Sequence, residues 1–182
     1  MEEKNKAWKT VSSKYLFRRP WLTVRCEDML LPNGNHIPEY YILEYPDWVN
    51  TIAITKEGKF VFVRQYRPGI QRTCYELCAG VCEAEDASPL VSAQRELWEE
   101  TGYGKGNWQE YMVVSANPST HTNLTHCFLA TDVELIDHQH LEDTEDLSVH
   151  LFTLEEVRSL LENNEIMQSL NAAPLWKYMA SL

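Results

Sequence analysis

The sequence predicts an α+β fold in which strands predominate, and three observations support this. Short runs typical of strands fill most of the chain, with polar or Gly/Pro-containing turns between them. One helix is predicted in the interior and two more near the C-terminus. Strands and helices do not alternate regularly, as they would in a parallel βαβ sheet. We therefore expect a mixed sheet packed against helices.

The first part of the chain is predicted to form six strands separated by turns. Asn33-Gly34 marks a turn, since this pair tolerates positive φ. Lys56–Lys59 is predicted to be a hairpin turn, while Pro46-Asp47 and Arg67-Pro68-Gly69 interrupt the pattern elsewhere. The predicted strands are Val11–Phe17, Leu22–Leu30, Ile37–Glu44, Val49–Thr55, Phe60–Tyr66 and Thr73–Ala79.

The interior helix has clear signals at both ends. Ser88 is predicted to be its N-cap and Pro89 its first residue, and Gly102 stops it after Thr101. Three further strands and two helices follow. They are predicted at Trp108–Ala116, Cys127–Thr131 and Ser148–Phe152 for the strands, and from Thr153 or Leu154 to Leu161 and from about Ile166 to Met179 for the helices.

Composition narrows the class of protein. A length of 182 residues fits one domain with a small appended element. The net charge of −11 argues against general nucleic-acid binding, which depends on basic surface. No apolar run approaches the roughly 20 residues that span a bilayer. An odd count of five cysteines favours free thiols, so we expect a cytoplasmic protein. From the net charge and the lack of a long apolar run, we expect it to bind neither nucleic acid nor membrane.

The interior helix carries three carboxylates near its C-terminal end, where the macrodipole disfavours negative charge. Glu96 and Glu100 lie one turn apart, with Glu99 beside them and Arg95 within reach of Glu99. Oxygen ligands at this spacing suit a divalent ion such as Mg2+. The alternative is a solvated helix end that holds one Arg–Glu pair. The following residues favour the metal.

Arg95–Tyr103 fits the second half of the Nudix box, R-E-U-x-E-E-x-G-U, and Gly80 fits the glycine that opens the box. The chain thus resembles the Nudix hydrolases. Gly80 to Arg95 is one residue longer than the box requires, so its first glutamate falls on Ala87 or Asp86, depending on the end from which one counts. Asp86 or Glu85 is expected to replace it.

Two further segments resemble the ADP-ribose pyrophosphatase-like branch of this family, namely Val63–Pro68 and Glu76–Gly80. The resemblance implies an α/β/α sandwich of the Nudix type with a mixed sheet, plus N-terminal antiparallel strands. It implies that residues 1–46 form a dimerisation element and 47–182 the hydrolase domain. It also implies Mg2+-dependent cleavage of a nucleoside diphosphate sugar, such as ADP-ribose, to a nucleoside monophosphate and a sugar phosphate.

The resemblance also assigns roles to residues. Arg95 would orient the glutamates, and Arg67 and Glu76 would bind substrate. Gly80 with Asp86 or Glu85 would shape the loop. The metal ligands, for Mg2+ or in its place Mn2+, would be the Ala79 carbonyl, Glu96, Glu99 and Glu100, of which Glu99 and Glu100 also count as catalytic.

The acidic stretch Glu142–Asp146 resembles the late loop that supplies a catalytic carboxylate in this family, so the resemblance implies that the catalytic base lies there. Asp143 is the first choice, followed by Glu145 and Glu142, and a solvated acidic loop is the rival interpretation. His36, His138, His140 and His150 show no ligand spacing. His121 and His126 flank the loop after the box and could face substrate, but isolated histidines are more often surface or core residues than ligands, so no histidine is a candidate site residue. The alternative function is a weakened Nudix module that binds nucleotide sugars as a sensor or partner-binding domain, because the first box glutamate is displaced.

Overall fold

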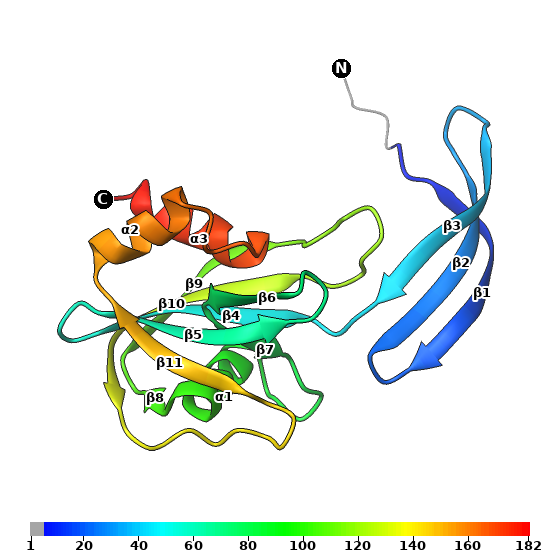
Figure 1. Cartoon of the computed structure of the whole chain (residues 1–182). Helices are drawn as coiled ribbons and strands as arrows, with labels where there is room; N and C mark the ends of the chain where they lie inside the picture. Colours follow the sequence, from blue (N-terminus) through cyan, green and yellow to red (C-terminus); the bar gives the residue numbers. More distant parts are fainter. Residues whose placement is uncertain (1–5) are drawn as a thin grey trace. The chain divides into compact units, whose positions relative to one another are not determined.

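The computed structural model describes residues 6–182, which form two units (Figure 1). The first unit comprises the chain up to Pro46 together with the loop Asn117–Asn123. The second comprises Asp47–Ala116 and Leu124–Leu182. The sequence-based division had placed the loop in the second segment. The chain therefore returns to the first unit at residues 117–123, between the two segments of the second unit.

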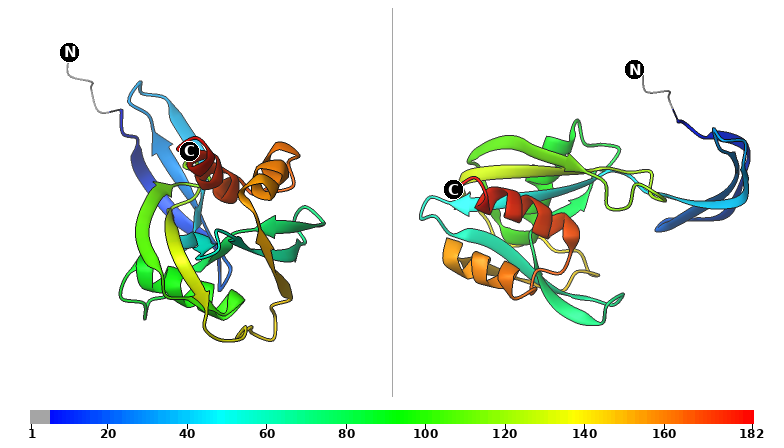
Figure 2. Two further views of the ribbon diagram at one scale, coloured as in Figure 1. Left: turned by 90° about the vertical axis from the view of Figure 1, so that its left-hand side faces the viewer. Right: turned by 90° about the horizontal axis from the view of Figure 1, so that it is seen from above.

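The first unit is a three-stranded antiparallel sheet in the order β1-β2-β3, with β1 at Lys9–Arg19, β2 at Leu22–Leu30 and β3 at His36–Glu44. Figure 2 shows how strongly these strands curve. At the predicted turn between β2 and β3, Gly34 has a φ of 87°, a conformation that glycine adopts without strain. The sequence therefore identified all three strands, with β2 at its full length.

The second unit is built on a mixed sheet in the order β11-β5-β4-β10-β8, with β6 paired to β5, β7 to β4 and β9 to β10. β10 runs parallel to β4, and the other pairs are antiparallel. The strands are β4 Trp48–Thr55, β5 Phe60–Arg67, β6 Arg72–Glu76, β7 Cys78–Val81, β8 Tyr103–Gly104, β9 Asn107–Val114, β10 Thr125–Leu135 and β11 Leu147–Phe152.

Helices cover both faces of this sheet, as Figures 1 and 2 show. α1, at Pro89–Thr101, lies on one face, and α2 (Leu154–Glu162) and α3 (Ser169–Met179) lie on the other. The described chain is thus an α+β sandwich with a mixed sheet, which confirms the predicted fold class. No helix of the described residues is long and apolar enough to cross a membrane.

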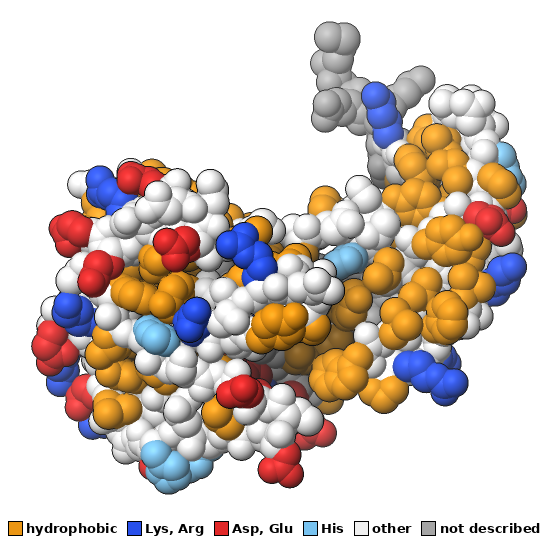
Figure 3. All heavy atoms as spheres, in the orientation of Figure 1, with side chains coloured by type: hydrophobic (Ala, Val, Ile, Leu, Met, Phe, Trp, Pro, Cys, Tyr) orange, Lys and Arg blue, Asp and Glu red, His pale blue; other side chains and the backbone are white. Residues whose placement is uncertain are grey.

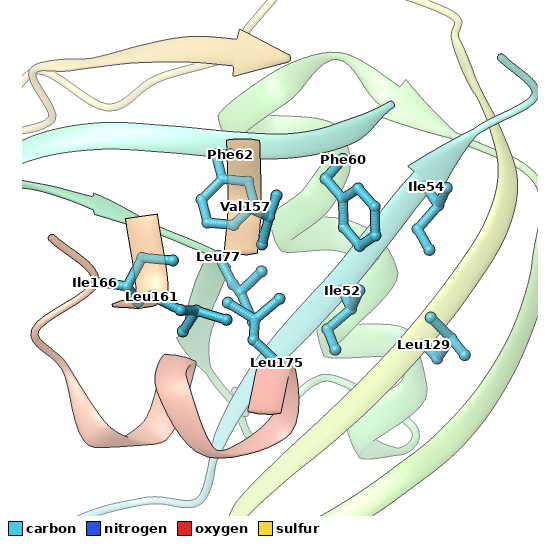
Figure 4. Close-up of a cluster of buried hydrophobic side chains, with 10 residues drawn as sticks. All are labelled: Ile52, Ile54, Phe60, Phe62, Leu77, Leu129, Val157, Leu161, Ile166 and Leu175. Atoms are coloured by element: carbon cyan, nitrogen blue, oxygen red, sulfur yellow. The ribbon is translucent and has the colours of Figure 1, made fainter. Parts of the chain in front are cut away.

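Two apolar layers hold the sandwich together. On the α1 face, Leu97 packs with Val61 and Ala130 from the sheet. On the other face, a larger cluster joins the sheet to α2 and α3 (Figure 4). Its members are Ile52, Ile54, Phe60, Phe62, Leu77, Leu129, Val157, Leu161, Ile166 and Leu175. Burying such side chains contributes roughly 1.5–3 kcal/mol each, so the first layer fixes α1 against one face of the sheet and the second fixes α2 and α3 against the other.

The ends of α1 agree with the sequence. The Ser88 hydroxyl accepts a hydrogen bond from the Val91 N–H at 3.4 Å, and Pro89 is the first helical residue. Gly102 ends the helix in the left-handed region with φ at 74°, and its N–H donates to the Trp98 carbonyl. Both boundaries are as predicted, because capping is determined by local chemistry.

Elsewhere the boundaries differ for physical reasons. The single strand predicted at Thr73–Ala79 is divided at Leu77, where the chain passes from pairing with β5 to pairing with β4. β10 extends beyond the predicted Thr131, because Asp132 adopts a φ of 59° at a bulge and the chain then pairs with the short, unpredicted β8. α3 begins at Ser169, three residues after the predicted Ile166, which is buried in the core before the helix.

Candidate active site

The loop between β7 and α1 and the inner face of that helix meet around the guanidinium of Arg95. Its Nη1 donates to Glu96 at 3.0 Å and to Glu99 at 2.9 Å. Its Nη2 donates to Asp86 and to the Val81 carbonyl, each at 3.0 Å. One arginine thereby ties two helix carboxylates to the loop that precedes the helix. Such charge-assisted bonds fix side-chain orientation as well as adding energy.

Asp86 is the loop carboxylate that faces Arg95. Its side chain is only 11% exposed, and its hydrogen bond from Arg95 lowers the pKa of the Asp86 carboxyl. Glu85 and Ala87, the neighbours on either side, are exposed. Of the two replacements that the sequence left open for the first box glutamate, Asp86 is therefore the one at the centre of this ion-pair network.

Gly80 is required here by lack of space. A Cβ atom built on Gly80 would lie 2.0 Å from Cδ of Glu96 and 2.1 Å from its Oε1. The carboxylate of Glu96 thus lies directly against the backbone of β7. Burial raises the pKa of the Glu96 carboxyl, and the charge and hydrogen bond of Arg95 oppose that rise.

Glu100 is the most deeply buried of the helix carboxylates, at 4% exposure. Its Oε2 accepts a hydrogen bond from the Ala79 N–H at 3.1 Å. Burial raises the pKa of Glu100 to about 8; hydrogen bonds from Cys78 and Ala79 oppose the rise, and the charges of Glu96 and Glu145 add to it. A carboxyl in such a place is destabilised as an anion unless a cation lies nearby.

The donors in this cluster fit a divalent metal ion. Glu96, Glu99 and Glu100 supply hard carboxylate oxygens from one helix face, next to the backbone of Ala79 and Gly80. Mg2+ and Mn2+ prefer this type of ligand. Positive charge here would also offset the unfavourable burial of Glu96 and Glu100. We conclude that the residues present suit the metal that the sequence led us to expect.

A cavity of about 230 Å3 lies beside the cluster and is bordered by Ala79, Gly80 and Arg67. Arg67, at the end of β5, donates to both carboxylate oxygens of Glu76, with Nε to Oε1 at 2.8 Å. Glu76 is 2% exposed, whereas the Arg67 side chain is 42% exposed. The two predicted substrate-binding residues therefore form one bidentate pair, in which Glu76 holds Arg67 and leaves part of the guanidinium open to solvent.

The same cavity has polar groups that sequence analysis missed. Asn50 and Asn171 line it together with Thr125. Thr125 Oγ1 and Asn171 Oδ1 are buried and lack a hydrogen-bond partner within the described residues. Asn50 donates to the Leu170 carbonyl at 2.7 Å, an oxygen that Pro174, four residues later and without an N–H, cannot satisfy. An amide within the apolar run of β4 was the available signal.

The late acidic loop lies between β10 and β11, and its residues 142–146 are exposed. Within it, the Glu142 N–H donates to the Glu145 carboxylate at 3.0 Å, and the Glu145 N–H to the Glu142 carbonyl at 3.0 Å. Among the three candidate bases, Glu145 contributes to the raised pKa of Glu100. Asp143, the first choice from sequence, lies at the turn of this loop.

Comparison with known proteins agrees with this arrangement. Residues 45–172 match the model of the NUDIX domain, and residues 8–43 match the N-terminal domain of nucleoside diphosphate sugar hydrolases. The first match alone covers more than half of the chain. The chain therefore belongs to the Nudix family, and the N-terminal match confirms the branch that the sequence motifs suggested.

Individual relatives point the same way. The chain is 31% identical to an ADP-ribose pyrophosphatase of Bacillus subtilis, over 90% of this chain and 88% of that protein. It is 29% identical to a methanol dehydrogenase activator of Bacillus methanolicus, over 88% of this chain and 86% of that protein. A crystal structure of an ADP compounds hydrolase superimposes with a TM-score of 0.83 at 21% identity, covering 96% of this chain and 94% of that one. The last match concerns the fold alone.

Proposed function

We propose that this protein hydrolyses the diphosphate bond of a nucleoside diphosphate sugar, ADP-ribose or a related compound, with Mg2+ as cofactor. The products are a nucleoside monophosphate and a sugar phosphate. The observation that carries the proposal is the carboxylate cluster around Arg95, which lies against Ala79 and Gly80 of β7, two residues that border the same cavity as Arg67. The similarity to proteins named ADP-ribose pyrophosphatase favours a nucleotide sugar as substrate.

Glu96, Glu99, Glu100 and the Ala79 carbonyl would hold the metal, which when bound would supply positive charge for the diphosphate oxygens and would polarise the attacking water. Arg95 keeps Glu96 and Glu99 in place through its hydrogen bonds. Asp86 holds Arg95 from the loop side. In this proposal the network orients ligands, and Arg95 itself does not contact substrate.

We assign the base that accepts the water proton to the late loop, with Glu145 as first candidate ahead of Asp143 and Glu142. The charge of Glu145 adds to the raised pKa of Glu100, so of the three candidates Glu145 is the one whose proximity to the cluster is supported. Its bond to the Glu142 N–H keeps the loop folded around it. Glu145→Gln should then lower kcat more than Asp143→Asn or Glu142→Gln.

Arg67 would bind a phosphate oxygen through the part of its guanidinium that Glu76 leaves exposed. The bidentate pair with Glu76 fixes the orientation of Arg67 before substrate arrives. Thr125 Oγ1 and Asn171 Oδ1, buried in the same cavity without partners among the described residues, offer hydrogen bonds to hydroxyl groups of the sugar or ribose.

A substrate panel tests the proposal directly. The protein is incubated with Mg2+ and ADP-ribose, ADP-glucose, UDP-glucose, GDP-mannose and dinucleoside polyphosphates, and products are separated by chromatography. We expect monophosphate release from at least one nucleotide sugar and a large loss of turnover in Glu100→Gln. Absence of turnover on every compound would refute the enzyme assignment.

We also propose that the first unit joins two copies of the chain. Large apolar side chains are exposed on β1 and its neighbours, including Val11, Phe17 and Trp21, the last at 81% exposure (Figure 3). β1 is exposed along its whole length and forms an edge of its sheet. A three-stranded sheet is stable when one face is buried, so a second copy is the simplest cover.

A second candidate function is regulation of another enzyme. The similarity to a protein named methanol dehydrogenase activator is the observation in its favour. In this case the chain would bind a nucleotide sugar, or act on one, while contacting a partner protein. Tight nucleotide-sugar binding in calorimetry without product formation would favour this function over turnover.

A further inference from the structure

Three side chains after β10 bring metal-binding atoms together outside the proposed active site. They are Asp137, His138 and His140, which offer one carboxylate and two imidazoles. One ligand atom from each lies within 4.8 Å of the others. In the sequence, the spacing of His138 and His140 matches no familiar ligand pattern. The fold, and not the spacing, brings these three groups together.

The backbone of this segment is fastened to the C-terminal end of α1. The Gly102 carbonyl accepts from the N–H groups of Ile136 at 2.9 Å and Asp137 at 3.1 Å. The His140 N–H donates to the Glu99 carbonyl at 2.8 Å, and the Gln139 side chain donates to the Glu100 carbonyl at 2.8 Å. These bonds hold the donors in place before any ligand binds.

The side chains are also arranged in advance. The His140 ring stacks on Trp98 with centroids 4.1 Å apart, and its Nε2 lies 3.0 Å from Oδ2 of Asp137. Nδ1 of His138 lies 2.7 Å from Oδ1 of the same carboxylate, and the two imidazole centroids are 4.3 Å apart. Asp137 therefore bridges both rings.

We propose that Asp137, His138 and His140 bind one first-row transition-metal ion, Zn2+ or Ni2+, with water completing its coordination. Imidazole nitrogens suit these ions, and three protein ligands with an open position are a known arrangement for zinc. The site differs in chemistry from the all-oxygen cluster of Glu96, Glu99 and Glu100, which suits harder cations. Its ion would replace the present hydrogen bonds between the two rings and Asp137.

Binding at this place acts on the helix that carries the glutamates. The segment is bonded to the carbonyls of Glu99, Glu100 and Gly102, so the ion would lie near the negative end of the α1 macrodipole. Occupancy should therefore raise the melting temperature, because the ion binds the folded state and not the unfolded one. This effect does not depend on the proposed hydrolysis.

The test is a titration of the full chain with Ni2+ and with Zn2+ in the presence of excess Mg2+, without substrate. Calorimetry should give one equivalent of Ni2+ bound. Quenching of tryptophan fluorescence should accompany binding, because His140 stacks on Trp98. His138→Gln should weaken Ni2+ affinity at least tenfold while leaving the fold intact, since the His138 side chain is 80% exposed.

His36→Gln is the matched control. His36 is an exposed histidine that pairs with a single carboxylate, Asp28, at 3.0 Å, so its loss should leave Ni2+ binding unchanged. Trp98→Phe should abolish the quenching and retain the calorimetric stoichiometry. The proposal is overturned if His138→Gln binds Ni2+ as tightly as the wild type, if Mg2+ displaces the ion competitively, or if no Ni2+ binds.

Discussion

At the scale of single residues, the neighbouring loop carboxylates Asp86 and Glu85 can be compared, because only one of them contacts the site. Asp86 bonds to Arg95, whereas Glu85 is exposed. We predict that Asp86→Asn lowers metal affinity by about 10–100-fold, the range found when a group that orients a ligand is removed. Glu85→Gln is the control. Mg2+ dependence of the rate measures both, and equal effects of the two changes would contradict the assignment.

Also at the scale of single residues, Glu100 makes the stability of the folded protein depend on pH. Its pKa is raised by burial to about 8, above the ordinary value of 4.5. Between these two values the folded state holds a proton that the unfolded state has lost, so stability falls as pH rises. We predict that the melting temperature of the metal-free protein decreases from pH 5 to pH 8 and that added Mg2+ restores more stability at pH 8.

Glu100→Gln should flatten this decrease, because the amide does not titrate. Glu134→Gln is the control, since its exposed carboxyl pairs with Lys56 and has a pKa below the ordinary value. Its contribution is complete above pH 5, so the slope between pH 5 and 8 should persist. Thermal unfolding at several pH values measures both variants, and an unchanged slope in Glu100→Gln would show that another group is responsible.

At the scale of elements, the contact between β7 and α1 decides the geometry of the site. Gly80→Ala would place a methyl group where the Glu96 carboxylate lies. We predict about a 100-fold loss of kcat, in line with ångström-scale misplacement of a catalytic group. Gly69→Ala is the control, because nothing lies within 4 Å of its Cβ position. Comparable rates in Gly80→Ala and wild type would mean that Glu96 is not needed.

Much of the element-level structure was predictable from local chemistry. The Ser88 cap, the Pro89 start and the Gly102 stop gave α1 its correct limits. β8 was not predictable, because a two-residue strand exists through its pairing with the end of β10 and has no pattern of its own. The start of α3 was missed because Ile166 continues the apolar pattern although it packs in the core outside the helix.

In the candidate site, too, features set by local spacing were predictable and features set by distant contacts were not. The helix carboxylates and Arg95 were identified because their spacing places them on one face. The choice between Asp86 and Glu85 depends on how the loop folds, and the polar lining from Asn50 and Asn171 depends on contacts between distant segments. The same is true of His138 and His140, whose grouping results from the bonds between their segment and α1. Sequence spacing cannot supply such contacts.

At the scale of the whole molecule, the proposed dimer is testable. Val11 and Phe17 are exposed on β1 at 52% and 55%. We predict that Val11→Lys combined with Phe17→Lys converts a dimer to a monomer in sedimentation velocity. Leu135→Lys, at a position of the second unit that is somewhat more exposed (64%), should leave the dimer intact. A monomeric wild type would refute the proposal.

The loop Asn117–Asn123 has a consequence for dissecting this protein. Leu43 of β3 donates to the Thr120 carbonyl and accepts from the Thr122 N–H, and it forms a parallel bridge with His121. The N-terminal unit is therefore built from two separate segments of the sequence, although its three strands are consecutive. If the chain were cut after Pro46 and the fragments separated, the loop would lose its backbone hydrogen-bond partner Leu43. The backbone groups of Leu43 on the N-terminal fragment would then be unpaired. A separable first unit would have to carry residues 117–123 with it, for example as a circular permutant or a grafted peptide.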